Sequence, residues 1–118
     1  MFNLVILAGN IASDIDVRAS QTGTYVAKFR LATHSFAGKA EDGTRKEATD
    51  FHNIVAFGKL AEFSGHHLKK GRAVIVQGRL HTSSWEDPAT STRKYMTEVV
   101  ADEIRFAGSR PQEEAEAA

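Results

Sequence analysis

Flat aromatic side chains on one side of a predicted strand are the residues of this chain best suited to bind something. Phe51 and Phe57 belong to the stretch Thr49–Leu60, where strand alternation places them opposite Ile54 and Ala56. If Ile54 and Ala56 face the core of a small barrel, both phenylalanines are left outside it. An exposed ring offers a π-face on which another flat group can stack.

The tryptophan follows the same pattern on another predicted strand, Ala73–Trp85. One face of that strand carries Val74, Val76, Gly78 and Leu80, and the other carries Ile75, Gln77, Arg79, His81, Ser83 and Trp85. Trp85 therefore lies on the polar, cation-bearing face. Rings beside cations are typical of surfaces that bind single-stranded nucleic acid, because every base has a π-face and lysine or arginine can contact phosphates.

The elements that must position these side chains form an all-β domain. Five strands are expected, with Val17–Ala19 as a possible continuation of the first; they are Phe2–Ile11, Tyr25–Ser35, the strand beginning at Thr49, Ala73–Trp85 and Lys94–Phe106. In the second strand the predicted core face is Tyr25, Ala27, Phe29 and Leu31. Apolar spacing predicts a short helix from Lys59 to Leu68, between the third and fourth strands. This order predicts a five-stranded Greek-key barrel, the OB-fold.

Two connections are expected to leave the barrel. Residues 36–48 are polar and predict a mobile loop that turns at Asp42-Gly43, a pair typical of type I′ turns. Glu86–Arg93 predicts the turn of a long hairpin that protrudes beyond the barrel. We assign residues 1–107 to the domain and expect residues 108–118, rich in Glu and Ala, to be a disordered tail.

Composition and motifs exclude several classes of function. The 118 residues include 15 basic and 15 acidic side chains and no cysteine, so disulfides and thiolate metal sites are excluded. No apolar run has the ~18 residues of a membrane helix. Adjacent His66 and His67 point to different sides of a helix, and no catalytic motif surrounds a nucleophile. We therefore predict no enzyme activity, no metal or other cofactor, no small-molecule substrate and no membrane partner.

Six cations are candidates for phosphate contacts: Lys28, Arg30, Lys59, Lys70, Arg72 and Arg79. Lys28 and Arg30 face away from the predicted core, and Arg79 shares the face of Trp85. Lys70 and Arg72 follow the helix, and a solvated helix end explains them equally well.

Blocks spread over residues 2–106 resemble the bacterial-type single-stranded DNA-binding proteins, the SSB family. These blocks are Leu4–Ile11, Asp16–Arg18, Phe29–Thr33, Phe51–Glu62, Leu68–Gly71 and Gly78–Trp85. The resemblance implies an OB-fold homotetramer that wraps and protects single-stranded DNA in replication, recombination and repair. It also implies a cytoplasmic, nucleoid-associated protein.

The resemblance implies roles for individual residues as well. The family's stacking aromatics fall on Phe51, Phe57 and Trp85, and Phe36 lies one position before a fourth. Its basic backbone-contacting positions match Lys59 and Lys70. His52 matches a histidine at a subunit interface.

Departures from the family pattern leave alternatives open. Ser83, Ser84, Asn53 and Leu4 stand where basic residues are common, which predicts fewer phosphate contacts. The sequence ends without the acidic, hydrophobic-tipped tail of the family's longer members, as expected of a short or accessory paralogue or of a chain whose tail is missing. An OB-fold protein–protein adaptor of the primosomal type and a cold-shock-like RNA binder are the rival functions.

Overall fold

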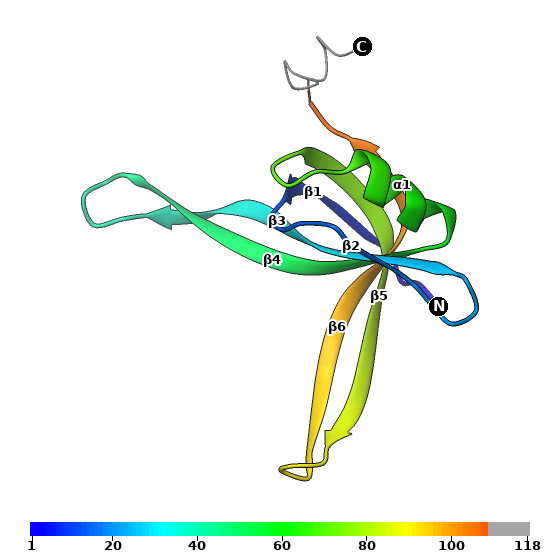
Figure 1. The fold of residues 1–118 in the computed structure, drawn as a ribbon. Helices are drawn as coiled ribbons and strands as arrows, with labels where there is room; N and C mark the ends of the chain where they lie inside the picture. The colour runs from blue at the N-terminus through cyan, green and yellow to red at the C-terminus, as the bar shows by residue number, and fades with distance from the viewer. Residues whose placement is uncertain (109–118) are drawn as a thin grey trace.

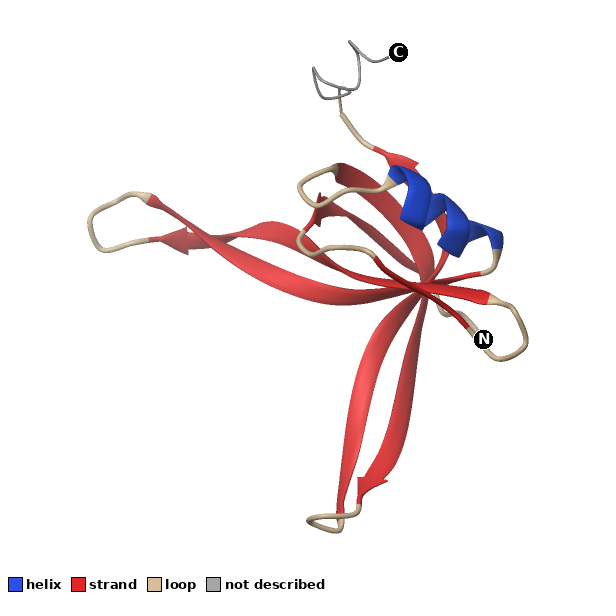
Figure 2. Ribbon diagram, in the orientation of Figure 1, coloured by secondary structure: helices blue, strands red, loops and turns tan. Residues whose placement is uncertain are grey.

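Alternating apolar residues build six strand segments in the part of the chain that the computed structural model describes, residues 1–108. The elements are β1 (Val5–Ile11), β2 (Asp16–Ala19), β3 (Tyr25–Lys39), β4 (Arg45–Phe57), α1 (Lys59–His67), β5 (Ala73–Asp87) and β6 (Thr92–Phe106) (Figure 1). Strands dominate, and the single helix lies against one end of the barrel (Figure 2). The predicted tail, apart from Gly108, lies outside the described residues.

The strands close into a five-stranded barrel. Their order is β1-β5-β6-β4-β3-β2, and β1 also pairs with β3 through Asn10–Ala32 and Ile11–Leu31. Because β1 and β2 both pair with β3, they are two halves of one first strand. Counted this way, α1 follows the third strand of the barrel, so the predicted all-β fold with its helix is confirmed.

The core is built mainly from the inward-facing residues that alternation predicted. Ala27, Leu31, Ala56, Val74 and Val76 are all fully buried. Two predicted core residues are not buried, because each lies where a strand leaves the barrel. Tyr25, at the start of β3, is 41% exposed, and Leu80, where β5 runs out of the barrel, is 50% exposed.

Two glycines allow strands to approach one another closely at the barrel's turns. A Cβ added to Gly9 would lie 2.1 Å from the carbonyl oxygen of Ala32. A Cβ added to Gly78 would lie 2.1 Å from the carbonyl oxygen of Val100, beside an irregularity in the β5–β6 register. Glycine is therefore required at both points, since any side chain would collide with backbone.

Two β-ribbons project from the barrel, one formed by β3 and β4 and the other by β5 and β6 (Figure 1). The β5–β6 ribbon confirms the predicted protruding hairpin. The prediction of a loop over residues 36–48 is wrong in extent, because strand pairing continues to Lys39 and resumes at Arg45.

The turn at the tip of the β3–β4 ribbon also differs from the prediction. A type I′ turn needs positive φ at both central residues, whereas here Gly43 alone of the Asp42-Gly43 pair has it, at 84°. The Gly43 amide donates to the Ala40 carbonyl, and the Asp42 carboxylate accepts from the amide and hydroxyl of Thr44. These bonds from Thr44 hold the pKa of Asp42 below its ordinary value.

Candidate nucleic-acid interface

Side chains from four neighbouring strands share one outer face of the barrel. Residues directly opposite in an antiparallel pair point to the same side, so Lys28 lies beside Val55, and Arg79 lies beside Val100. The short parallel pairing of β4 with β6 places Val55 beside Val100 and joins the two halves. We call this surface, which runs over β3, β4, β6 and β5, the outer face.

The three predicted stacking aromatics lie on the outer face and its continuation along the β5–β6 ribbon. Phe51, Phe57 and Trp85 are 52%, 50% and 45% exposed, while Ile54 on the opposite side of β4 is buried. Phe51 and Phe57 are six residues apart, about 20 Å along the strand at ~3.3 Å per residue. The two rings are thus too far apart for one flat group to contact both.

Cations lie close to these rings. The guanidinium carbon of Arg30 lies 4.5 Å from the centroid of the Phe51 ring, a cation–π contact. Lys59 is exposed and follows Phe57 by two residues, at the start of α1. Arg30 is therefore in contact with one of the three rings, and Lys59 lies close to a second in the chain.

Two other predicted cations of the outer face have acidic partners. Lys28 Nζ lies 3.8 Å from Glu98 Oε2, and Arg79 Nη1 lies 3.4 Å from Asp102 Oδ1. The side chains of Lys28 and Arg79 are more than half exposed, so they can still turn toward a phosphate. Their attraction for phosphate is nevertheless reduced by the carboxylate beside each of them.

The two cations that follow α1 have different surroundings. Lys70 is exposed in the turn between α1 and β5. Arg72 is only 8% exposed, and its guanidinium carbon lies 4.5 Å from the centroid of the Phe106 ring. Burial against Phe106 favours a packing role for Arg72, so its predicted phosphate contact has no geometric support.

His52 and Phe36 lie apart from the three rings. His52 is opposite Leu31, on the inward side of β4, and its Nε2 lies 2.8 Å from the Thr33 hydroxyl. Phe36 is 56% exposed on the β3–β4 ribbon, where the Arg45 guanidinium carbon lies 5.0 Å from its ring centroid. Phe36 is therefore an accessible ring beside a cation, as Phe51 is.

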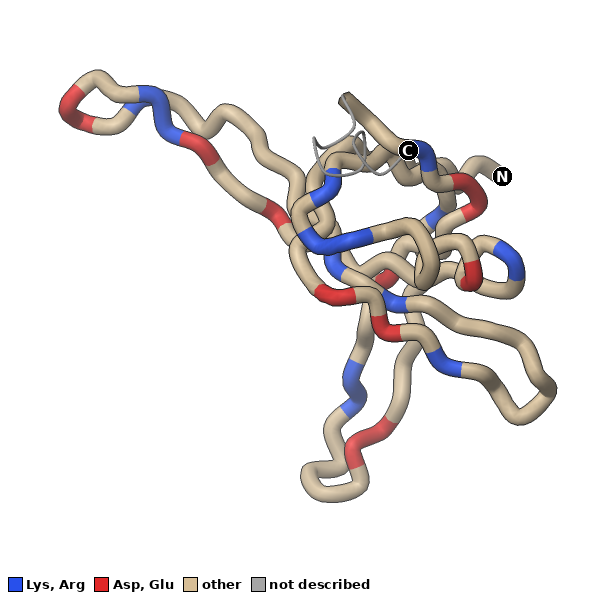
Figure 3. The backbone as a smooth tube through the Cα atoms, turned by 45° about the horizontal axis from the view of Figure 1, so that its top comes forward, with Lys and Arg blue, Asp and Glu red and all other residues tan. Residues whose placement is uncertain are grey.

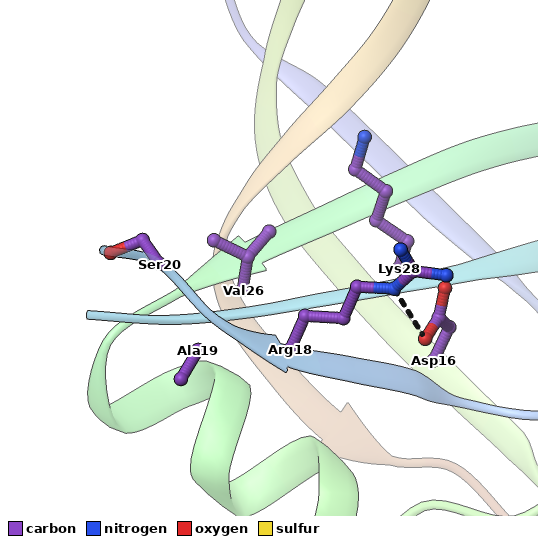
Figure 4. Close-up of a pocket in the computed structure, with 6 residues that line it drawn as sticks. All are labelled: Asp16, Arg18, Ala19, Ser20, Val26 and Lys28. Atoms are coloured by element: carbon purple, nitrogen blue, oxygen red, sulfur yellow. Dashed lines mark hydrogen bonds and ion pairs between the residues drawn. The ribbon is translucent and has the colours of Figure 1, made fainter. Parts of the chain in front are cut away.

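Two shallow cavities adjoin one another on β3. The first, about 330 Å³, lies between β2 and β3 and includes Asp16, Arg18 and Lys28 among its lining residues. In Figure 4 the Arg18 guanidinium pairs with Asp16, and the Lys28 side chain extends away from that pair. The second cavity, about 210 Å³, shares Asp16 and Lys28 and continues over the outer face to Asn53 and Glu98.

Three residues on or near this surface were not singled out from the sequence. Glu98 lies in the middle of the outer face, and Arg45 lies over Phe36. Tyr95 is 67% exposed on the β5–β6 ribbon, opposite Ser84 and thus on the side away from Trp85. Alternation along β6 gives the faces of Glu98 and Tyr95, but their neighbours depend on strand pairing.

Charges of both signs are mixed over the surface. Lysine and arginine lie among aspartate and glutamate on the barrel and on both ribbons (Figure 3). Within residues 1–108 no helix has the length and apolarity needed to cross a membrane. The same residues contain no group of three or more histidine or carboxylate side chains placed to hold a metal ion.

Comparisons with known proteins agree with this geometry. The sequence model of the single-strand binding protein family matches residues 2–107. Single-stranded DNA-binding protein 1 of Chlorobaculum tepidum is 42% identical over 108 residues, which is 92% of this chain and 66% of that protein's length. A structure of the Plasmodium falciparum SSB in complex with ssDNA superposes with a TM-score of 0.81 at 31% identity. It covers 92% of this chain and 97% of the other.

Proposed function

Because this chain belongs to the single-strand binding protein family, we propose that it binds single-stranded DNA through its outer face. Bases stack on Phe51, Phe57 and Trp85, with Phe36 as a further ring, and nearby lysine and arginine side chains contact phosphates. Binding is independent of sequence, since stacking uses a face that every base has. The protein protects single strands in replication, recombination and repair, and acts as a binding protein without enzymatic activity.

One observation carries this proposal: three half-exposed aromatic rings lie on the outer face and its continuation along the β5–β6 ribbon, and the Arg30 guanidinium lies over one of them. Leaving such rings in water is unfavourable, at about 25 cal/mol per Å² of apolar surface. A stacked base contributes roughly 1–3 kcal/mol per ring. Three rings would supply about 3–9 kcal/mol, against the ~8 kcal/mol of a micromolar complex.

We also propose that the protein acts as a homo-oligomer, most simply a homotetramer, since one such domain binds only weakly. Support comes from β1, whose residues 5–9 pair with β5 on one side and do not pair with β3 on the other. Leu4 and Ile6 beside this open edge are 53% and 61% exposed. An open strand edge flanked by apolar side chains is suited to pairing with a second copy.

A titration of Trp85 fluorescence with oligo-dT at several salt concentrations tests the function. We expect quenching that salt reverses, because stacking brings a base onto the indole and phosphate contacts release counterions. A plot of log affinity against log salt concentration gains a slope of about 0.7 for each phosphate contact on a single strand. We expect a shallow total slope, because Lys28 and Arg79 are paired with carboxylates and so contribute less to phosphate binding. Absence of quenching would favour the protein–protein adaptor instead, and a preference for rU over dT oligomers would favour an RNA binder.

A further inference from the structure

We propose that the 210 Å³ cavity at the centre of the outer face receives the Watson–Crick edge of an unpaired base, which hydrogen-bonds to Glu98 and Lys28. This inference rests on the proposed function and adds to it a second mode of recognition, by base edge as well as by base face. It would also favour single strands over duplexes, because the Watson–Crick edge is accessible only when a base is unpaired.

The size and position of the cavity suit the edge of a base. It lies at the level of Asn53 on β4, between the positions of Phe51 and Phe57 on the same face. Its volume far exceeds the ~15 Å³ that one water needs. Its lining includes the apolar side chain of Met96 beside polar side chains such as Asn53, and sites for flat, partly polar ligands combine apolar and polar groups in this way.

The charges of the cavity disfavour a phosphate. Three carboxylates (Asp14, Asp16 and Glu98) and two cations (Lys28 and Arg30) line it. A phosphate placed here would meet more negative than positive charge, whereas a neutral base edge would not be repelled. A strand that crosses the outer face should therefore turn its bases, and not its backbone, toward this cavity.

Glu98 is held in place, while Lys28 can adjust. The Glu98 side chain is 13% exposed, and that of Lys28 is 57% exposed. The 3.8 Å between Lys28 Nζ and Glu98 Oε2 is an ion-pair distance, longer than a hydrogen bond. A base that donates an N–H to the carboxylate would thus add a charge-assisted hydrogen bond to a group fixed within the sheet.

A hydrogen-bond acceptor beside a donor, here the Glu98 carboxylate and the Lys28 ammonium, can pair with the Watson–Crick edge of every base. Cytosine and adenine carry an amino group beside a ring nitrogen acceptor, and thymine and guanine carry a ring N–H beside a carbonyl oxygen. In each case a carboxylate can accept and an ammonium can donate. Such a pocket strengthens binding without selecting a sequence, which is consistent with the proposed function.

The test compares two short strands of equal length, oligo-dT and the same oligomer made from N3-methylthymine, whose ring N–H is blocked. We expect the wild-type protein to bind the methylated strand about tenfold more weakly, since a hydrogen bond to a charged group contributes about 1.5 kcal/mol or more. Glu98→Ala should bind oligo-dT about tenfold more weakly than wild type and lose the difference between the strands. Glu98→Gln, which keeps the side-chain volume, should fall between the two.

The matched control is Glu103→Ala, which removes a β6 carboxylate that pairs with Arg105 and does not line the cavity. If Glu98 only repels phosphates, Glu98→Ala would tighten the binding of both strands, and this result would overturn the proposal. Equal binding of both strands by the wild-type protein would also overturn it while leaving the proposed function intact. Failure of the wild-type protein to bind either strand would instead contradict the proposed function.

Discussion

On the outer face, the Phe51 ring is covered by the Arg30 guanidinium, which a stacking base could replace. Arg30 lies over the Phe51 ring at 4.5 Å, an arrangement that contributes about 0.5–1 kcal/mol at an exposed site. A stacked base contributes roughly 1–3 kcal/mol, so a base can displace the guanidinium. Under the proposed function, the displaced Arg30 would then be able to contact a phosphate of the same strand. The cation would thus cover the ring in the absence of DNA and contribute to binding in its presence.

Removing individual rings should weaken DNA binding without unfolding the domain. We expect Phe57→Ala and Trp85→Ala each to cost about 1–3 kcal/mol of binding free energy, because both side chains are half exposed and contribute little to the core. Anisotropy of a labelled oligo-dT measures both variants, and circular dichroism checks the fold. Tyr95→Ala is the matched control, since Tyr95 is an exposed ring on the opposite side of the β5–β6 ribbon. Unchanged affinity in both variants would show that the interface lies elsewhere.

The elements of the barrel follow closely from the sequence, because one face of each strand is buried and leaves an alternating pattern. Buried Phe29 and Leu31 in β3 and Val74 and Val76 in β5 are examples. The ribbons leave a weaker pattern, since both of their faces meet solvent. Residues 36–39 extend β3 because Phe36 and Lys39 pair with β4, and backbone pairing of this kind does not require apolar side chains. Their strand structure could not be predicted from hydrophobic periodicity for this reason.

Within the barrel, strand packing depends on the two glycines that admit close contact. We expect Gly9→Ala and Gly78→Ala each to lower the free energy of unfolding by about 3 kcal/mol or more, because the new methyl group would lie 2.1 Å from a backbone oxygen that cannot move aside. Urea denaturation followed by circular dichroism measures the loss. Gly23→Ala is the comparison variant, because its new Cβ would meet no atom within 4 Å. It should lose only about 1–2 kcal/mol, the strain of an alanine at a left-handed φ of 84°. Equal losses at all three positions would contradict a specific role for close packing.

At the scale of the whole molecule, the candidate site depends on how the barrel closes. Alternation predicts that Phe51, Phe57 and Trp85 point outward, but it cannot predict which side chains meet across strands. Lys28 on β3 reaches Glu98 on β6 because β4 lies between them, paired in parallel with β6 at Ile54–Val99 and Val55–Val100. The two β4–β6 pairings join residues about 45 positions apart in the chain. The central cavity is therefore a property of the closed barrel and has no local sequence signature.

The proposed assembly into a homo-oligomer can be tested at two positions, His52 on β4 and Ile6 on β1. His52 is half buried on the inward side of β4, with its Nε2 bonded to the Thr33 hydroxyl, and Ile6 is 61% exposed beside the open edge of β1. We expect His52→Trp and Ile6→Asp each to lower the mass measured by light scattering, the first by steric bulk and the second by placing a charge in an apolar contact. Gln21→Asp, in an exposed turn, should keep the wild-type mass. Variants that fold and retain the wild-type mass would place the subunit contact on another surface, and the β1 edge would then need a different explanation.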